Sequence, residues 1–171
     1  MTLRDFLPVL FFCCLTFYFA QCGVAHKSAR NDRTERMDDR EQRLRQDIVR
    51  SAQRYKGTKY QYAGRQPGGF DCSGLICYVM SENGLALDGS SATQEGYGRS
   101  IRPEQAQAGD LIFFRRSRTG RVFHVALVVA NEADGIYIIH ATSSRGVVID
   151  NLTTNSYWSE KFMTARDVVS E

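Results

Sequence analysis

Apolar positions in the middle of the chain repeat with helical spacing before they give way to strand-like runs. Between residues 41 and 55 they recur every three or four positions, which predicts an amphipathic helix that ends near Gly57. A second helix is predicted from residue 73 to about residue 82, because Asn83-Gly84 then supplies a typical C-terminal signal. Both helices precede every predicted strand.

The second half of the chain is rich in β-branched and aromatic residues. Four runs are predicted to be strands: Asp110 to Phe114, Phe123 to Ala130, Ile136 to Ala141 and Gly146 to Ile149. Their connections are too short for crossover helices, so we expect an antiparallel meander. A turn of helix near Trp158 and a last strand near residues 165 to 169 would close the domain. Helices followed by an antiparallel sheet indicate an α+β fold.

The N-terminus has the pattern of an export signal. Residues 6 to 20 are apolar, follow Arg4, and form a run too short for a membrane-spanning helix, which suits a secretory signal. The run ends near Cys22, where a bacterial lipobox has the cysteine that becomes lipidated; residues 1–22 are therefore predicted to be a signal peptide with a lipobox. Phe19 and Gln21 depart from the usual lipobox residues. The alternatives are a plain cleaved signal and an uncleaved anchor.

Charge and composition separate a linker from a folded domain. Residues 23–40 are dense in charge and predict a flexible tether, which leaves residues 41–171 as the folded domain. Lysine and arginine number 22 and aspartate and glutamate 19, an excess too small to indicate nucleic-acid binding. The composition is that of an ordinary globular protein.

Two of the five cysteines lie in the predicted domain. Cys72 precedes the second helix, where unpaired backbone N–H groups and the helix dipole favour a thiolate, the reactive form of cysteine. Cys77 lies one turn further on and is interpreted as an inert core residue. Since no cysteine or histidine cluster has metal-binding spacing, we expect no structural metal site.

Three histidines are present, and His26 lies in the predicted tether. His124 begins one predicted strand and His140 ends another. If these strands are antiparallel neighbours, both histidines lie at one edge of the sheet. Such a pair beside a cysteine at a helix start is typical of a nucleophile with its base and orienting residue.

Five segments in order resemble the NlpC family of bacterial cell-wall cysteine peptidases, which have a papain-like core. They are Tyr60-Gln61-Tyr62-Ala63-Gly64, Phe70-Asp71-Cys72-Ser73-Gly74-Leu75, Ala108-Gly109-Asp110-Leu111-Ile112-Phe113-Phe114, His124-Val125-Ala126 and Ile139-His140-Ala141. The resemblance covers about residues 44 to 169. Ala63 departs from the glycine that is usual there, and we expect little consequence.

The resemblance implies a role for each matching residue. Cys72 would attack an amide carbonyl, His124 would hold it as a thiolate–imidazolium pair and protonate the leaving amine, and His140 would orient His124. The Cys72 N–H and the Tyr60 hydroxyl would stabilise the oxyanion.

Two further sequence features are each compatible with two interpretations. Asp71 and Ser73 would bind a polar group of the substrate or cap the helix. The basic stretch from Arg115 to Arg121 would flank the substrate groove or form a solvated turn, and the turn is favoured.

The implied function is hydrolysis of an amide bond in murein stem peptides or cross-links, of the kind made by D-Glu or diaminopimelate. This implied hydrolysis needs no cofactor. Peptidoglycan would be the partner of a monomeric, exported enzyme, tethered by lipid to a bacterial membrane and facing the periplasm. An acyltransferase or lipid hydrolase on the same core is one alternative. A catalytically inactive cell-wall-binding module is another, although Cys72 and both histidines are present.

Overall fold

The computed structural model describes residues 32–170, so the predicted signal, Cys22 and residues 23–31 of the predicted tether lie outside the described residues. The chain divides after Arg40 into two units. The described end of the first unit, residues 32–40, is helical, which corrects the prediction of a flexible tether there. Opposite charges four residues apart, such as Asp32 and Arg36 at 2.8 Å, support helix in a segment without glycine or proline.

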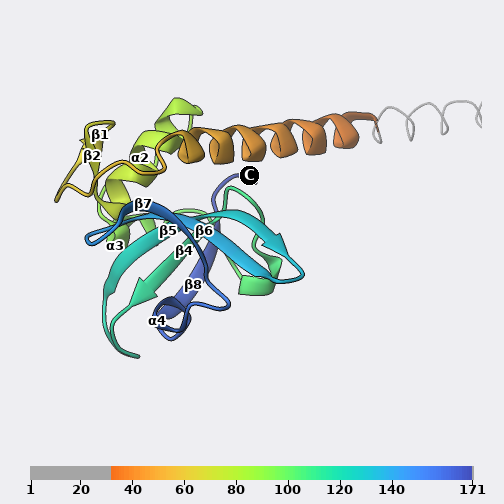
Figure 1. The fold of residues 1–171 in the computed structure, drawn as a ribbon. Coiled ribbons are helices and arrows are strands. Elements are labelled where there is room, and N and C mark those ends of the chain that lie inside the picture. The colour runs from red at the N-terminus through yellow and green to blue at the C-terminus, as the bar shows by residue number, and fades with distance from the viewer. Residues whose placement is uncertain (1–31, 171) are drawn as a thin grey trace, which may run out of the picture. The chain divides into compact units, whose positions relative to one another are not determined.

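The second unit begins with the predicted helix, which ends at residue 54 (Figure 1). Helix α2 follows as Cys72–Glu82, and α3 and α4 are single turns at Ser91–Gln94 and Ser156–Ser159. A small hairpin of β1 (Arg65–Gln66) and β2 (Gly69–Phe70) precedes α2. None of the helices formed by residues 32–170 is long and apolar enough to span a membrane.

One antiparallel sheet forms the centre of this unit. Its six strands are, in spatial order, β3 (Arg99–Ile101), β8 (Phe162–Asp167), β4 (Leu111–Arg115), β5 (Val122–Glu132), β6 (Gly135–Thr142) and β7 (Gly146–Asn151). The predicted meander is confirmed for β4 to β7. The last strand instead returns to pair with β4, and β3 was missed because it is short and has a single apolar residue.

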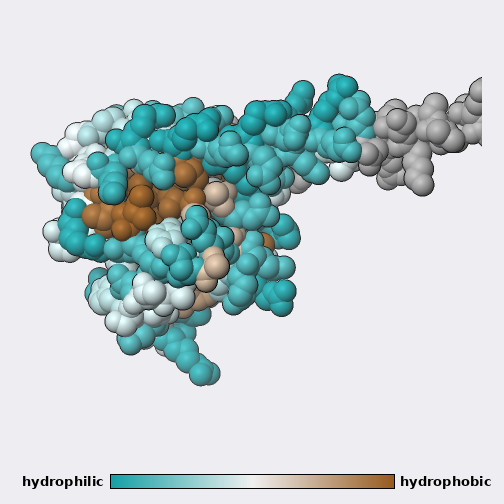
Figure 2. All heavy atoms as spheres, turned by 45° about the vertical axis from the view of Figure 1, so that its right-hand side comes forward, coloured by the Kyte–Doolittle hydropathy of each residue, from teal (hydrophilic) through white to brown (hydrophobic). Residues whose placement is uncertain are grey.

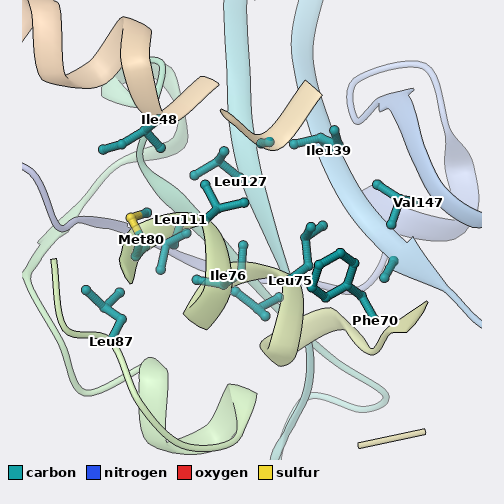
Figure 3. Close-up of a cluster of buried hydrophobic side chains, with 14 of the residues drawn as sticks. Ile48, Phe70, Leu75, Ile76, Met80, Leu87, Leu111, Leu127, Ile139 and Val147 are labelled. Carbon is teal, nitrogen blue, oxygen red and sulfur yellow. The ribbon is translucent and has the colours of Figure 1, made fainter. Parts of the chain in front are cut away.

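Alternate residues of the central strands pack on opposite faces of the sheet. Leu111 and Phe113 of β4 belong to the cluster under helix α2, whereas Ile112 and Phe114 belong to a second cluster that contains Trp158. Figure 3 shows Leu75, Ile76 and Met80 of α2 packed toward Leu127 and Ile139 of the sheet. Burial on both faces explains why these strands are apolar without alternation.

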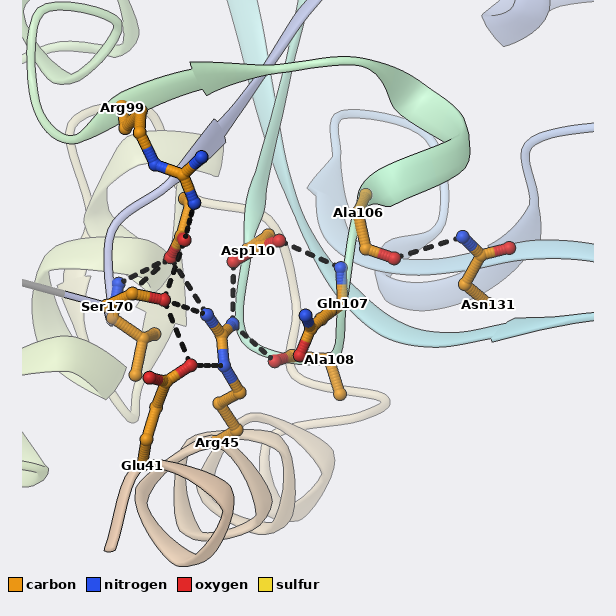
Figure 4. A network of polar contacts seen from close by, with 11 residues as sticks. Glu41, Arg45, Arg99, Ala106, Gln107, Ala108, Asp110, Asn131 and Ser170 are labelled. Carbon is orange, nitrogen blue, oxygen red and sulfur yellow. Dashed lines mark hydrogen bonds and ion pairs between the residues drawn. The ribbon is translucent and has the colours of Figure 1, made fainter. Parts of the chain in front are cut away.

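A buried arginine fixes the first helix of the domain to the sheet (Figure 4). Arg45 lies 2.7 Å from Asp110 and 2.8 Å from Asp167, and its Nη1 also donates to the carbonyl of Ala108. Burial outweighs this ion pair for Asp110 and raises its pKa to about 6. For Asp167, hydrogen bonds from Ser170 overcome the effect of burial and lower the pKa. The network ties the helix to the start of β4 and the end of β8.

The face of the molecule drawn in Figure 2 is mostly hydrophilic. Figure 2 shows apolar side chains gathered in one area of the face in view, surrounded by hydrophilic residues. Among residues 32–170, the exposed large apolar residues are Met37, Tyr62, Tyr97 and Tyr157, and of these four only Tyr157 belongs to the site described next.

Candidate active site

The nucleophile candidate is the first residue of helix α2. Asp71 has an extended backbone and caps the helix, since its Oδ1 accepts a hydrogen bond of 2.6 Å from the Gly74 N–H. A Cβ atom at Gly74 would lie 1.9 Å from the Gly64 carbonyl oxygen, so only glycine allows this approach. The two motifs around Gly64 and Gly74 are therefore held against each other, and Cys72 lies beside their contact.

The turn before Gly64 contains a residue with an unusual backbone. Ala63 has a φ of 55°, in the left-handed region that favours glycine. The departure from the family's glycine, expected to matter little, thus puts a side chain where it costs about 1 kcal/mol or more. The turn is closed by a 2.9 Å hydrogen bond from the Gly64 N–H to the Gln61 carbonyl.

Asp71 and Ser73 take part in the helix cap. Besides the Gly74 N–H, Asp71 accepts a 3.0 Å hydrogen bond from the Ser73 hydroxyl. Neither residue lines the pocket that contains Cys72. These contacts support the capping interpretation, while a role in substrate binding stays a prediction.

The two histidines meet as the strand prediction required. His124 near the start of β5 and His140 near the end of β6 have Nε2 and Nδ1 atoms 2.9 Å apart. Nε2 of His140 lies 2.9 Å from Oδ2 of Asp150 in β7, which was not predicted. All three are shielded from water, with His140 fully buried. The result is a polar chain from the pocket into the sheet.

Trp158 forms the wall beside both histidines. Its ring stacks on His124 with centroids 4.5 Å apart, and meets His140 edge-on at 4.8 Å. Trp158 was predicted only as part of a helical turn, with no role in the site. It is the only tryptophan in the chain and lies in the polar segment Ser-Tyr-Trp-Ser. A lone large aromatic residue in a polar segment was the sequence signal that could have marked it as part of the site.

A pocket of about 450 Å³ brings the candidate residues together. Its lining comprises Tyr60, Cys72, Arg116, Phe123, His124, Ala141, Thr142, Ser143, Ser144, Arg145, Asn155, Tyr157 and Trp158. Among residues 32–170, no side chain or backbone group forms a hydrogen bond with the Tyr60 hydroxyl, which leaves it available to a ligand. Arg116 lies over the Phe123 ring at 4.7 Å. Part of the basic stretch is therefore groove wall, although a solvated turn was favoured.

Burial dominates the electrostatics of the reactive pair. It raises the pKa of the Cys72 thiol to about 11, although backbone N–H groups of Val125 and Ser73 act in the opposite direction. It lowers the pKa of His124 to about 3, and His140 adds to that shift. The position of Cys72 at a helix start predicted a lowered cysteine pKa, but burial of the sulfur outweighs the effect of the helix terminus. Both shifts favour a neutral thiol beside a neutral imidazole in the free protein.

Comparison with known proteins settles the family. The model of the NlpC/P60 family matches residues 57–167, which include Tyr60, Cys72 and His124 of the pocket and the buried His140 behind it. The chain belongs to the NlpC/P60 family. The resemblance inferred from its five motifs is thereby confirmed, as is the α+β fold.

Individual relatives of this NlpC/P60 chain include named hydrolases. Gamma-DL-glutamyl hydrolase of Bacillus subtilis is 39% identical over 127 residues, which are 72% of this chain and 30% of the relative. The murein DD-endopeptidase MepS/murein LD-carboxypeptidase of Escherichia coli is 34% identical over 68% of this chain and 58% of the relative. The chain thus spans less than two thirds of each of these relatives.

A solved structure has the same fold. The NlpC/P60 family protein from Bacillus cereus superposes with a TM-score of 0.67 at 30% identity, over 74% of this chain and 40% of that one. Among residues 32–170 of this NlpC/P60 chain, no group of three or more histidine, cysteine or acidic side chains is arranged to hold a metal ion.

Proposed function

We propose that this NlpC/P60 chain is a peptidoglycan hydrolase that cleaves an amide bond in murein stem peptides or cross-links. The observation that carries the proposal is the shared pocket of Cys72 and His124, with His124 hydrogen-bonded on its far side to His140. A thiol and an imidazole with an orienting partner are the components of cysteine-dependent acyl transfer. The names of the Bacillus subtilis and Escherichia coli relatives support amide bonds of this polymer as the substrate.

The mechanism follows from which histidine nitrogen remains free. Nε2 of His124 is occupied by His140, so Nδ1 is the atom available to take a proton from the Cys72 thiol. The sulfur attacks the carbonyl carbon, and the proton moves to His124 as the S–C bond forms. His124 then protonates the leaving amine, which produces a thioester on Cys72. Water, deprotonated by the same imidazole, attacks the thioester and restores the thiol.

Basic residues of the pocket fit an anionic peptide. Arg116 and Arg145 both line it; Arg145 is already paired with Asp150, whereas no acidic side chain of residues 32–170 forms an ion pair with Arg116, which is thus the cation available to a substrate. Stem peptides with D-Glu or diaminopimelate have free carboxylates near the amide bonds. A charge-assisted hydrogen bond to such a carboxylate would orient the substrate in the groove.

Tyr60 is proposed as an oxyanion donor together with the Cys72 N–H. Burial raises the pKa of the Tyr60 phenol, and Cys72 adds to the shift, so the hydroxyl keeps its proton at neutral pH. Tyr60→Phe removes only this oxygen, and we expect turnover to fall by about 10²–10³-fold with little change in melting temperature. Steady-state kinetics on a purified muropeptide measure this. Tyr62→Phe is the matched control, because Tyr62 is exposed and outside the pocket. Wild-type turnover in Tyr60→Phe would return the residue to a structural role.

Digestion of muropeptides of known structure, followed by mass spectrometry, tests the proposed function. A hydrolase gives two products whose masses sum to that of the substrate plus one water. The acyltransferase alternative gives a product joined to an added amine or alcohol acceptor, and an inactive wall-binding module leaves the muropeptide intact. Either of these results would overturn the proposal.

A lipid anchor at Cys22 is proposed from the sequence pattern alone. A processed lipoprotein has several acyl chains, which hold a protein on a membrane more firmly than one chain does. The mature protein should therefore sediment with membranes and resist high salt, and Cys22→Ala should release it or block its processing. Intact-mass measurement of the native N-terminus decides this. An unlipidated N-terminus at Gln21 would show that the departures at Phe19 and Gln21 from a usual lipobox matter.

A further inference from the structure

The row of hydrogen-bonded side chains that begins at His124 does not end at His140 but continues to Asp150. We propose that Asp150, clamped by Arg145, is a positioning residue that sets the tautomers of both histidines and so leaves Nδ1 of His124 free to accept a proton. The inference rests on the proposed function for its kinetic consequence, whereas the tautomers themselves can be measured without turnover.

The sheet brings Asp150 to His140. In the pairing of β6 with β7, His140 lies opposite Val148 and Ile138 lies opposite Asp150. Asp150 is thus two residues from the direct partner of His140, on the same face and at diagonal distance. Its Oδ2 is 2.9 Å from Nε2 of His140, and its side chain is 11% exposed.

Arg145 fixes the carboxylate from the hairpin that joins the two strands. Its Nη1 donates to Oδ1 of Asp150 at 2.9 Å and its Nη2 to Oδ2, a two-point contact that sets the plane of the carboxylate. The hairpin is itself held, because the Arg145 N–H donates to the Thr142 hydroxyl and that hydroxyl donates to the Gly146 carbonyl. Asp150 therefore has one orientation in which to meet His140.

A carboxylate can only accept hydrogen bonds, and this determines which ring nitrogens of His140 and His124 are protonated. His140 must donate through Nε2, so its Nδ1 is an acceptor when the ring is neutral. His124 must then donate through Nε2 to that atom, which leaves its own Nδ1 without a proton. Nδ1 is the atom that the mechanism requires as the base.

The charges around His140 keep this arrangement in place. Burial lowers the pKa of His140, and Arg145 acts in the same direction, although Asp150 opposes them. The hydrogen bond from Arg145 lowers the pKa of Asp150 below the usual range of a carboxyl group. His124, on the other side of His140, is neutral as well. The Asp150 carboxylate therefore orients the neutral rings of His140 and His124 without removing a proton from either.

Asp150→Asn tests the proposal, because asparagine keeps the size and one acceptor but adds an NH2 donor. That NH2 group can donate to Nε2 of His140 and reverse both tautomers. We expect kcat on a muropeptide to fall about 10–100-fold with KM little changed. Asp150→Glu should recover part of the loss. The matched control is Asp134→Asn, which removes a carboxylate from the β5–β6 turn, where it accepts a hydrogen bond from the Tyr137 hydroxyl and has no contact with either histidine.

Nitrogen-15 NMR of histidine-labelled protein gives the second readout, and the chain has only three histidines to assign. Wild type and Asp134→Asn should show His124 and His140 as neutral Nε2–H tautomers, and Asp150→Asn should show a changed tautomer at His140. Unchanged tautomers in a folded Asp150→Asn protein would overturn the proposal, whatever its activity. Since these spectra need no substrate, a wild-type protein without hydrolase activity would contradict the proposed function and still leave this result readable.

Discussion

Cys72→Ala is expected to lower muropeptide cleavage by at least about 10⁴-fold, because Cys72 is the only thiol that lines the pocket and the proposed thioester cannot form without it. The helix cap is made by Asp71 and Gly74, and alanine keeps it. The free energy of unfolding should therefore change by no more than about 1 kcal/mol. Product quantification by chromatography, with a thermal melt of the same sample, measures both.

Cys77→Ser is the matched control for this prediction. Cys77 is a buried thiol one turn further along α2, and its Sγ donates to the Leu87 carbonyl at 3.0 Å and accepts from the Gln94 amide at 3.2 Å. A serine hydroxyl can make the same two contacts, so most of the activity should remain. A folded Cys72→Ala protein that still cleaves, or a Cys77→Ser protein that is folded and inactive, would contradict the choice of nucleophile.

His124→Ala is expected to lower kcat/KM by about 10³-fold or more, because the proton on sulfur then has no acceptor and the leaving amine no donor. His140→Gln should cost less, about 10–100-fold, since an amide can still accept the hydrogen bond from Nε2 of His124. Kinetics of both variants on one muropeptide provide the comparison. Equal inactivation would mean that His140 does more than orient its neighbour.

The same histidine determines how activity responds to acid. His124 acts as a base only when it is neutral, and its pKa lies well below the ordinary 6.5 because the ring is buried. The plot of kcat/KM against pH, which reports groups of the free enzyme, should therefore stay level as pH falls through 6.5 and decline only at more acidic values. A limb centred near 6.5 would contradict the buried environment described for this ring.

The parts of the fold that a local pattern determines were predictable from sequence. Apolar spacing identified the helices around Ile48 and Leu75, and β-branched runs identified β4 to β7. The position of β8 was not predictable in this way, because its pairing with β3 and β4 depends on contacts between segments far apart in sequence. The helix over residues 32–40 was missed because charge density was taken to indicate disorder, although the charges alternate in sign at helical spacing.

In the site, too, residues with locally defined surroundings were predictable and residues placed by contacts between distant segments were not. Cys72 and His124 were recognisable because a helix start and a strand start define their surroundings locally. Asp150 was not, since its importance comes from lying diagonally opposite His140 across a strand pair. The direction of the Cys72 pKa shift was also beyond the sequence, because it depends on how deeply the packed sheet and Trp158 bury the pocket.

Covalent labelling tests the central claim, attack by Cys72 on a murein acyl group, most directly. Once digestion has identified the cleaved amide, the acyl half of that muropeptide can be made with a chloromethyl ketone in place of the amide. The thiolate should displace chloride and form one thioether, and peptide mapping by mass spectrometry should find it on Cys72, with activity lost in proportion to labelling. The unreactive methyl ketone serves as the control. Labelling confined to Cys77, or full activity with Cys72 unlabelled, would contradict the account.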